Sequence, residues 1–593
     1  MTNVNTLITD HLDIWTTATE AKPSSGRGNS KKTGLYGIQK LRSLILELAV
    51  RGKLVPQYQN EGDGSGAVAK LARKREELVK QKLAKTAKKL DELHEGDFPF
   101  PIPHGWSWAR LQDVSEYIQR GKGPKYADSG AVRVISQKCV QWNGFDLDKA
   151  RFIREDSIEG YGQERFLRDG DVLWNSTGTG TVGRVVTLPL ETDDRLVADS
   201  HVTVIRMLSD CPRFLEIYLS SSGIQNRIEP THEDALVSGT TKQVELNVST
   251  VLALPVPFPP MAEQHRIVAK VEELMTLCDA LEAQTEDSLK AHQTLVETCL
   301  ATLTNSQSPE ELTENWNRIE TNFDTLFTTE ESVECLRDAV LSLAIRGLLT
   351  KRYSPDEPAS VLLEQLFQSN MQTANSRHRT IMSKIREVEP PFPIPPSWAW
   401  SNLGSLSFDL RYGTSKKCGR DDSQTPVLRI PNVSGGQVTL EDMKFGPLEE
   451  KELSDLALRQ NDLLIIRSNG SLEIVGRFAW VPELDREYAF AGYLVRVRID
   501  PAFVDPRYIW YVSQSRFVRD QIELPIRHGV GLKNVNSTEL ASIAFPIPPR
   551  EEQKEVIYQI DSLFEYCDKL LKKIVDKNES IATLADTLTG KVH

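Results

Sequence analysis

Loops rich in glycine, lysine and arginine occur in matched pairs along the chain, and their residue types suit contacts to a polyanion. QRGKGPKY spans residues 119–126 and RYGTSKKCGR spans residues 411–420. A second pair, SGTTKQ at residues 238–243 and RHGVGLKN at residues 527–534, aligns Lys242 with Lys533. Glycine lets a backbone approach a phosphate closely, Lys and Arg neutralise its charge, and Thr, Asn, Gln or Arg can reach base edges. The chemistry that these loops could do is nucleic-acid binding.

These loops, together with two polar segments that follow predicted strands, supply the candidate contact residues. They are Arg120, Lys122, Lys125, Ser176, Thr177, Thr179, Thr241 and Lys242 in the first half of the chain, and Tyr412, Thr414, Lys416, Lys417, Arg467, Asn469, Arg527 and Lys533 in the second. Each loop by itself is equally typical of an ordinary surface turn. Their recurrence in both halves, with side chains that differ between the copies, indicates a binding function, and both interpretations stay open.

Gly178, Gly180 and Gly183 in STGTGTVGR form a GxGxxG pattern. In a dinucleotide-binding site this pattern opens a helix whose N-terminus faces the pyrophosphate, whereas here VGRVVTLPL continues as a β-rich run. The second copy, SNGSLEIVGRF, keeps Gly470 and Gly476 but loses the spacing. We interpret both segments as strand–loop–strand, with a nucleotide-dependent enzyme as the less favoured alternative.

No complete catalytic motif accompanies these loops. The sequence has no GxxxxGK[ST] phosphate loop, no HExxH, no GxSxG and no NPPY-type amino-methyltransferase motif. Its seven cysteines are scattered and include no CxxC pair, which indicates neither a zinc site nor a disulfide framework. We therefore expect a protein without cofactor or metal that is not itself an enzyme.

The elements that position the loops are repeated roughly 290 residues apart. FPFPIPHGWSWARL at residues 98–111 returns as PFPIPPSWAWSNL at 391–403, PFPPMAEQ at 257–264 returns as PIPPREEQ at 546–553, and LAVRG at 48–52 returns as LAIRG at 343–347. This repeat suggests a pseudo-dimer that presents two comparable, non-identical surfaces to a partner with its own approximate two-fold symmetry.

Short β-like runs alternate with polar loops between the repeated motifs, which predicts an α+β chain with two α/β domains, at residues 98–260 and 391–549. We expect a flexible extension over residues 1–34, a helical region over 35–97, a helical spacer with an acidic linker over 261–390, and a C-terminal helix over 550–593. Within the helical region, a helix over residues 38–50 should end at Gly52, and a basic helix should span residues 68–93.

Apolar residues after each EQ follow heptad spacing. They are Ile267, Val271, Leu274, Cys278 and Leu281 in the first copy, and Val556, Ile560, Leu563, Cys567, Leu570 and Ile574 in the second. Such a narrow stripe predicts coiled-coil helices, with the two seams paired antiparallel and the first helix running to about residue 303. The alternative, two unrelated amphipathic helices on separate cores, stays open.

The 593 residues carry a net charge of −12. Residues 263–335 hold sixteen Asp and Glu against four Lys and Arg, so the rest of the chain is neutral overall and can carry local basic clusters. No apolar run approaches the ~18 residues of a membrane span, and the first residues do not resemble a signal peptide. We expect a cytoplasmic protein.

The order of these motifs resembles the specificity subunits of type I restriction–modification enzymes, in which each of two variable domains is closed by a PPxxEQ-like junction into a helix. The junctions here read PPMAEQ and PPREEQ, and the resemblance covers about residues 35–593. It implies two target-recognition domains in a pseudo-two-fold arrangement, separated by long antiparallel coiled-coil helices, each reading half of a split double-stranded DNA site. It also implies two adenine-methyltransferase subunits and restriction–translocase subunits as partners that carry the catalysis. The alternative is a protein-binding scaffold with two paired domains.

Overall fold

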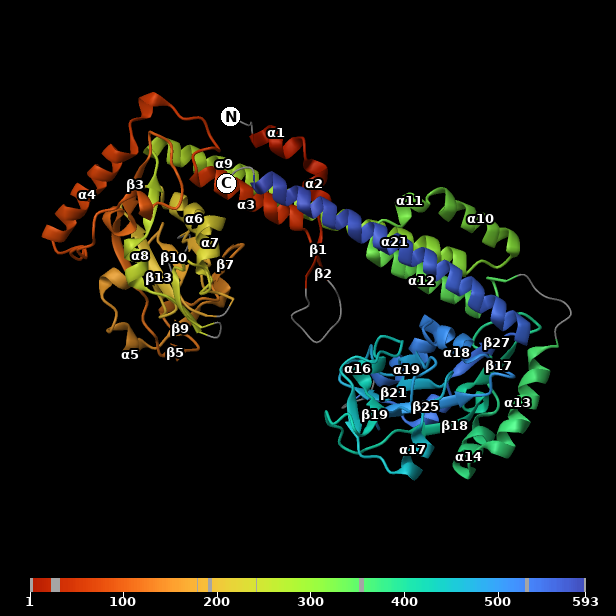
Figure 1. Ribbon diagram of the computed structural model, residues 1–593. Helices are drawn as coiled ribbons and strands as arrows, with labels where there is room; N and C mark the ends of the chain where they lie inside the picture. The colour runs from red at the N-terminus through yellow and green to blue at the C-terminus, as the bar shows by residue number, and fades with distance from the viewer. Residues whose placement is uncertain are drawn as a thin grey trace. The chain divides into compact units, whose positions relative to one another are not determined.

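The chain forms two compact units, each assembled from segments that are distant in the sequence (Figure 1). The computed structural model describes residues 4–22, 32–178, 180–189, 195–240, 243–350, 357–527 and 533–590. Unit 1 comprises Met1–Ala21, Thr33–Glu286 and Asn578–His593, and unit 2 comprises Lys22–Lys32 and Asp287–Lys577. Each unit contains a mixed helix-and-sheet domain together with parts of long helices, which confirms the predicted combination of helix and sheet.

The domain of unit 1 is built on two four-stranded sheets. The first has the antiparallel order β11–β10–β13–β4, formed by Val185–Thr187, Val172–Asn175, Val202–Met207 and Ser115–Arg120. The second has the order β12–β6–β9–β5, formed by Arg195–Ala198, Val132–Ile135, Arg151–Ile153 and Tyr126–Ala127, with β12 parallel to β6. One apolar core joins them, with Leu173 and Val204 from the first sheet and Ile135 and Leu196 from the second.

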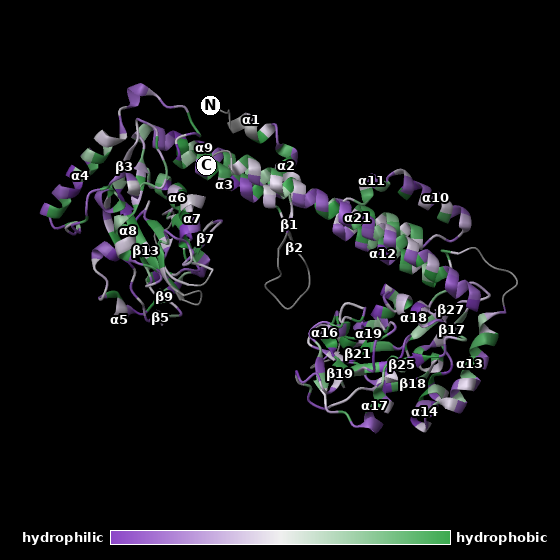
Figure 2. Cartoon of the chain, viewed as in Figure 1, coloured by the Kyte–Doolittle hydropathy of each residue, from purple (hydrophilic) through white to green (hydrophobic). Residues whose placement is uncertain are grey.

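The domain of unit 2 repeats this topology. Its first sheet has the order β18–β25–β21–β23, formed by Ser407–Tyr412, Leu494–Ile499, Leu463–Ile466 and Phe478–Trp480, again antiparallel. Its second sheet has the order β20–β19–β24, formed by Lys444–Gly446, Thr425–Leu428 and Ala489–Phe490, with β24 parallel to β19. Every residue of the central strands β10 and β21 is buried, and Figure 2 shows hydrophobic residues in the sheets of both domains.

Each domain is closed by a strand pair that explains two of the sequence repeats. β3 (Ser107–Arg110), in the first paired-tryptophan segment, pairs with β16 (Pro255–Phe258), which precedes PPMAEQ. In the second copy β17 (Ala399–Asn402) pairs in the same way with β27 (Ala544–Ile547). The repeated motifs are therefore the two ends of each domain, held side by side.

Helices follow the sheets in the same order in both domains. They are α6 (Pro212–Ser220), α7 (Ser222–Gln225) and α8 (Val248–Ala253) in the first, and α18 (Pro506–Ser513), α19 (Arg516–Arg527) and α20 (Ser537–Ala541) in the second. α6 and α18 each begin with proline, whose fixed φ suits the first helical turn. The Tyr218 hydroxyl of α6 donates to the Pro255 carbonyl at 2.8 Å, and the Tyr508 hydroxyl of α18 donates to the Pro546 carbonyl at 2.7 Å, so each helix is tied to its closing strand pair.

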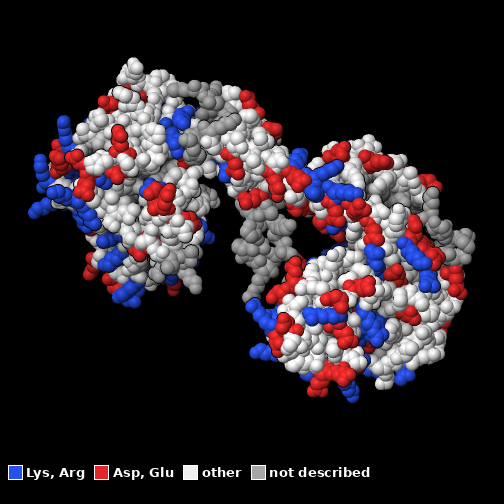
Figure 3. Space-filling model, in the orientation of Figure 1, with Lys and Arg blue, Asp and Glu red and all other residues white. Residues whose placement is uncertain are grey.

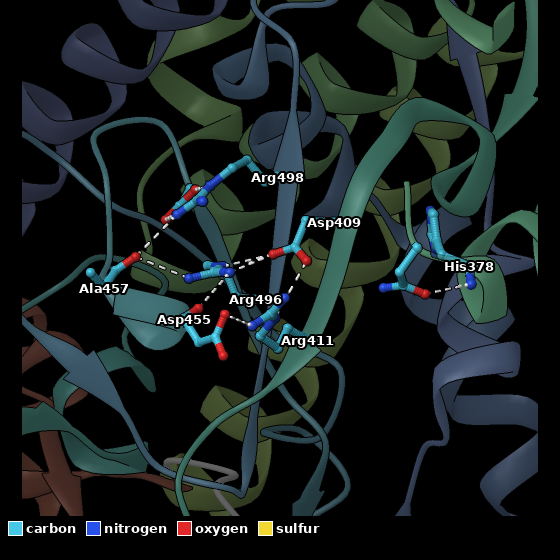
Figure 4. Close-up of polar contacts among 9 residues, drawn as sticks. His378, Asp409, Arg411, Asp455, Ala457, Arg496 and Arg498 are labelled. Atoms are coloured by element: carbon cyan, nitrogen blue, oxygen red, sulfur yellow. Dashed lines mark hydrogen bonds and ion pairs between the residues drawn. The ribbon is translucent and has the colours of Figure 1, made fainter. Parts of the chain in front are cut away.

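A buried arginine–aspartate pair is also repeated. Arg206 donates from Nε and Nη2 to Asp171 at 2.8 and 2.7 Å, and Arg498 donates likewise to Asp462 at 2.6 and 2.8 Å. Unit 2 adds Arg496, whose side chain is only 2 % exposed and whose guanidinium donates to Asp409 and to the Ala457 carbonyl (Figure 4). Burial and the adjacent Arg498 charge lower the pKa of Arg496.

The junction between helix and domain is duplicated in detail. α3 (Tyr36–Val50) ends at Gly52 with φ +66°, and α12 (Glu330–Ile345) ends at Gly347 with φ +67°. Only glycine adopts this backbone conformation readily, so the predicted helix end at Gly52 is confirmed. Beside these glycines, Arg51 lies 4.8 Å from the ring centroid of Phe100 and Arg346 lies 4.9 Å from that of Phe392.

The long helices α9 (Met261–Thr304) and α21 (Arg550–Gly590) follow the two PPxxEQ junctions, as predicted. Each long helix also contacts a short helix of its own copy. In unit 1 Arg42 of α3 bonds Asp279 of α9 at 2.7 Å, and in unit 2 the equivalent Arg337 of α12 bonds Asp568 of α21. Heptad spacing specifies a narrow apolar stripe but not every helix that contacts it.

α9 and α21 also contact each other, and in unit 2 this contact includes residues of the second seam. In unit 2, Val296 and Leu300 of α9 share an apolar cluster with Cys567 and Ile574 of α21 and with α12. α10 (Pro309–Thr321) and α11 (Phe323–Leu326) add Ile319 and Leu326 to the same cluster. In unit 1, Asp586 near the end of α21 accepts hydrogen bonds from Tyr36 and Lys40 of α3, both at 2.7 Å.

Two predictions near the N-terminus are corrected. Residues 4–22 form α1 (Val4–Thr9), α2 (Leu12–Thr17) and β1 (Glu20–Lys22) instead of a flexible extension, and Trp15 is fully buried where α2 packs on α3. The basic helix α4 (Gly64–Lys80) ends well before residue 93. Side chains of Arg75 and Gln112 bind the carbonyls of Lys85 and Lys88 at 3.0 and 3.1 Å, so this backbone is held outside a helix.

The remaining described elements are short or lie in the acidic linker. They are the 3₁₀ helices η1 (Gln59–Glu61), η2 (Glu95–Asp97), η3 (Leu111–Val114), η4 (Leu147–Lys149), η5 (Gln163–Arg165) and η6 (Asn226–Ile228), the helices α5 (Glu155–Ile158), α13 (Ala359–Thr373), α14 (Ser376–Ile385), α15 (Leu403–Leu406), α16 (Ile430–Val433) and α17 (Glu450–Leu456), and the strands β2 (Lys32–Gly34), β7 (Val140–Gln141), β8 (Gly144–Phe145), β14 (Val237–Thr240), β15 (Gln243–Leu246), β22 (Ser468–Asn469) and β26 (Lys533–Asn534). Within the described ranges, no helix combines the length and apolarity needed to span a membrane.

Candidate DNA interface

In the domain of unit 1, two predicted residues, Arg120 and Thr177, meet at one end of the first sheet. Arg120, the last residue of β4, donates from Nη1 to Glu245 of β15 at 2.6 Å. Thr177, which follows β10, forms an isolated bridge with Glu245 and contacts the Nδ1 atom of His201 at 2.5 Å. The cluster thus presents a guanidinium, a hydroxyl and an imidazole on neighbouring strand ends.

In the domain of unit 2, the equivalent strand ends bring another set of predicted residues together. Tyr412 is the last residue of β18, and the guanidinium of Arg467 lies 4.4 Å from its ring centroid. Asn469 of β22 is paired with Lys533 of β26, and Arg467 donates from Nε to Asn534 at 3.4 Å. Guanidinium, amide and ammonium groups suit phosphates and base edges.

The two clusters occupy the same place in the fold. The backbone N–H of Ser176 donates to the His201 carbonyl at 2.8 Å, and the N–H of Arg467 donates to the Tyr493 carbonyl at 3.0 Å. His201 and Tyr493 are therefore equivalent, and both are exposed, Tyr493 to 64 %. Neither was among the predicted contacts. Aligning the two copies pairs them, but only the fold shows that they are exposed beside the predicted residues.

Two predicted residues are held inside the domains, and a third is paired at the surface. Ser176 is fully buried with its hydroxyl 2.5 Å from that of Thr203, and Thr414 is 5 % exposed and donates to Glu452 at 2.8 Å. Lys416 also bonds Glu452, at 2.7 Å, and this hydrogen bond lowers the pKa of Glu452 and raises that of Lys416. The prediction that Ser176 and Thr414 contact DNA is corrected, because both are buried. A DNA contact by the partly exposed Lys416 stays a prediction.

The other described lysines of the predicted set lie on the surface. Lys122 is exposed and donates to the Gly160 carbonyl at 3.0 Å, and Lys125 lies 4.0 Å from Asp156 with 70 % of its side chain exposed. Lys417 is exposed and has no ion pair among the residues that the structure describes. On the face shown in Figure 3, basic side chains also gather over α4 and near α5 and β5 of unit 1. Local basic clusters thus coexist with a net acidic chain.

Four predicted residues cannot be placed in the clusters. Thr179, Thr241 and Lys242 lie outside the described residues, the last two between β14 and β15. Arg527 ends α19, and its side chain also lies outside them.

The cluster in unit 1 does not have the geometry of a nucleophilic triad. Asp199 accepts a hydrogen bond from the backbone N–H of His201 at 2.7 Å, whereas a triad carboxylate must hold the imidazole ring. In the part of the chain that the structure describes, no group of three His, Cys, Asp or Glu side chains is arranged to hold a metal ion. What both clusters can do chemically is donate and accept hydrogen bonds and neutralise charge.

Comparison with known proteins bears directly on these paired domains. The family described as type I restriction modification DNA specificity domain matches residues 103–291 and 407–579. The specificity subunits of the type I restriction enzymes EcoEI and EcoAI, both from Escherichia coli, are 31 % and 32 % identical to this chain over 99 % of it and 99 % of their own lengths. A solved chain described under complex assembly and conformational transition of the type I R-M system is 16 % identical, with a TM-score of 0.47 over 83 % of this chain and 99 % of that one.

Two matches to one family, placed on the two sheet domains, define a protein with paired DNA specificity domains. The chain belongs to the family of type I restriction–modification specificity subunits.

Proposed function

We propose that this chain is the DNA-specificity subunit of a type I restriction–modification complex. Each domain, at residues 98–260 and 391–549, reads one half of a bipartite double-stranded target. The chain directs adenine methylation by two methyltransferase subunits and, with restriction–translocase subunits, endonuclease cleavage. It supplies no catalytic group, needs no cofactor, and acts in the cytoplasm where its DNA target lies.

The observation that carries this proposal is the pair of equivalent clusters with different side chains. Arg120 and Tyr412 end equivalent strands, and His201 and Tyr493 occupy equivalent exposed positions. A duplicated scaffold fixes the same approach to DNA in both domains, while different side chains read different base edges. The two half-sites of the target should therefore differ in sequence.

The long helices support a separate proposal, that they set the distance between the half-sites. α9 begins in unit 1 and ends in unit 2, whereas α21 begins in unit 2 and ends in unit 1. We propose that the two helices run antiparallel, as their heptad spacing suggests. An antiparallel pair relates the two domains by a pseudo-two-fold axis, which matches the dyad of duplex DNA.

The test is methylome mapping of cells that express the chain with its methyltransferase partners. Replacing residues 98–260 with those of a relative should change one half of the methylated sequence and leave the other half and the spacer unchanged. A change in subunit assembly with an unchanged methylated sequence would favour the protein-binding scaffold instead. The purified chain alone should transfer no methyl group from S-adenosylmethionine to DNA.

A further inference from the structure

Unit 2 contains a pocket of about 240 Å³ at the junction between its long helices and its sheet domain. Ser342 and Arg346 of α12 line one side, and Phe392 and residues 515–517 at the start of α19 line the other. α12 packs against α18 and α19, and all three helices belong to unit 2, so the pocket lies within one unit. None of its lining residues belongs to the candidate DNA interface.

Unit 1 has a glutamate at the equivalent place. The LAVRG and LAIRG repeats align Glu47 with Ser342 and Arg51 with Arg346. Glu47 is only 3 % exposed, and its carboxylate accepts from the Nε atom of Arg51 at 3.1 Å and from the backbone N–H of Gly223 at 2.8 Å. A carboxylate thus joins the arginine of the helix to the segment that follows α6.

Unit 2 keeps the arginine but not the carboxylate. Arg346 lies over Phe392 as Arg51 lies over Phe100, so the guanidinium has the same position. Serine is shorter than glutamate and carries no charge, so residue 342 cannot neutralise it. The Nε atom of Arg346 is buried without a hydrogen-bond partner among the described residues, a costly state for a charged donor.

Neighbouring acids are engaged with other arginines. Arg516 at the pocket bonds Asp520 at 2.7 Å and lies 3.8 Å from Glu523. Glu523 in turn bonds Arg519 at 3.0 Å. The acids of α19 thus pair with the arginines of their own helix, and the described residues form no ion pair with Arg346.

We propose that this pocket binds a carboxylate that the chain itself does not supply, in the place that Glu47 occupies in unit 1. Arg346 forms the ion pair, and the rings of Phe392 and Phe517 enclose the methylene groups beside the carboxylate. The carboxylate comes either from an acidic side chain of a protein subunit or from a free carboxylic acid.

The first experiment titrates the full chain with propionate, which has the chemistry of a glutamate side chain, by calorimetry at constant ionic strength. We expect one site with a dissociation constant on the order of millimolar, and no binding of the neutral analogue propionamide. Ser342→Glu places the carboxylate of unit 1 in unit 2 and should abolish binding in a well-folded protein. Arg346→Gln should weaken binding at least tenfold. Glu47→Ser should open a second site.

The second experiment identifies the source of the carboxylate, and its protein arm rests on the proposed function. If a methyltransferase subunit supplies it, Ser342→Glu should weaken that subunit's association at least tenfold, and propionate should compete with it. If a free acid is the ligand, association should not change. Equal propionate binding by the original chain and Ser342→Glu, with equal subunit association, overturns the proposal. DNA binding is measured in a separate experiment. If the chain does not bind its DNA target, the proposed function is refuted, but the propionate result still stands.

Discussion

Adjacent lysines in the second basic loop have different surroundings. The ammonium group of Lys416 bonds Glu452 and the Pro447 carbonyl, at 2.7 and 2.9 Å, whereas the Lys417 side chain is exposed. Each phosphate contact that a protein makes adds about one unit to the salt dependence of its DNA affinity. The charge of Lys417 can therefore reach DNA, whereas the charge of Lys416 is already paired with Glu452.

We expect Lys417→Ala to weaken binding of the assembled complex to all DNA sequences and to reduce the salt slope by about one unit. Lys416→Ala is the matched control, and it should leave the slope unchanged because its charge is neutralised within the loop. Fluorescence anisotropy at several salt concentrations measures both. Equal slopes for the two variants would show that the Glu452 pair opens on DNA.

Arg467 should contribute to only one half of the target. Arg467→Ala removes a guanidinium from the cluster of unit 2 and should relax methylation specificity at one or two base pairs of one half-site, at a cost of about 1–3 kcal/mol in discrimination. Arg120→Ala should have the same effect on the other half-site. Methylome sequencing checks both variants. Loss of specificity in both half-sites from one substitution would contradict independent domains.

For single residues, the sequence predicted which loops are polar and basic better than it predicted which of their side chains are exposed. Composition and repetition located both basic loops, but Ser176 and Thr414 are as polar as Thr177 and are nevertheless buried. Which residue of a polar loop faces inward depends on strand register and on distant partners such as Thr203, which is 27 residues away. His201 was missed for the same reason.

The fold of each sheet domain depends on a few contacts between its strands and at the ends of its helices. β18 is joined to β25 by the buried Arg496, which bonds Asp409. Removing one partner of a buried ion pair leaves an uncompensated charge. The Asp409 carboxylate should therefore stabilise unit 2 far more than an exposed carboxylate does.

We expect Asp409→Asn to lower the free energy of unfolding by about 3–5 kcal/mol. Asp422→Asn, at an exposed position of the same domain, should change it by less than about 0.5 kcal/mol. Urea unfolding followed by tryptophan fluorescence gives both values. A small effect of Asp409→Asn would mean that Asp462 or water takes over the Arg496 guanidinium.

The helix end at Gly347 gives a second prediction for an element. A Cβ atom there would lie 2.5 Å from the Cγ atom of Pro395, at φ +67°. Gly347→Ala should therefore destabilise the protein by more than about 1 kcal/mol, whereas Gly435→Ala, which meets no atom within 4 Å, should be close to neutral. Thermal unfolding measures the difference. Similar melting temperatures would show that the junction relaxes at no cost.

The sequence predicted most of the long helices and the sheet domains, but it did not predict which elements pack against one another. Heptad spacing correctly located α9 and α21, but it did not predict that Arg42 of α3 and Arg337 of α12 would bond these helices. The helix expected to reach residue 93 stops at Lys80, because side chains distant in sequence bind the backbone carbonyls beyond it. Helix propensity acts locally, whereas such contacts depend on the tertiary fold.

In the whole molecule, α9 and α21 both cross the division between the units, near Glu286 and Lys577. Inserting seven residues after Glu286 and another seven after Lys577 lengthens both helices by roughly 10 Å, at ~1.5 Å per residue. Because each insertion is one heptad, both seams stay in register. We expect the same two half-sites with a spacer about three base pairs longer, at ~3.4 Å each. Methylome mapping reads the spacer directly. Full activity with an unchanged spacer would show that the helices do not set the distance.

The contact between α3 and α21 also bears on how the protein is made. Tyr36 and Asp586, which share a hydrogen bond, are separated by 550 positions. Ribosomes add roughly 5–20 residues per second, so α3 waits roughly half a minute to two minutes for this partner. During that interval unit 1 lacks one of its helices, and its final segment begins at Asn578, directly after unit 2 ends at Lys577. The domain that is translated first is therefore the last to be completed.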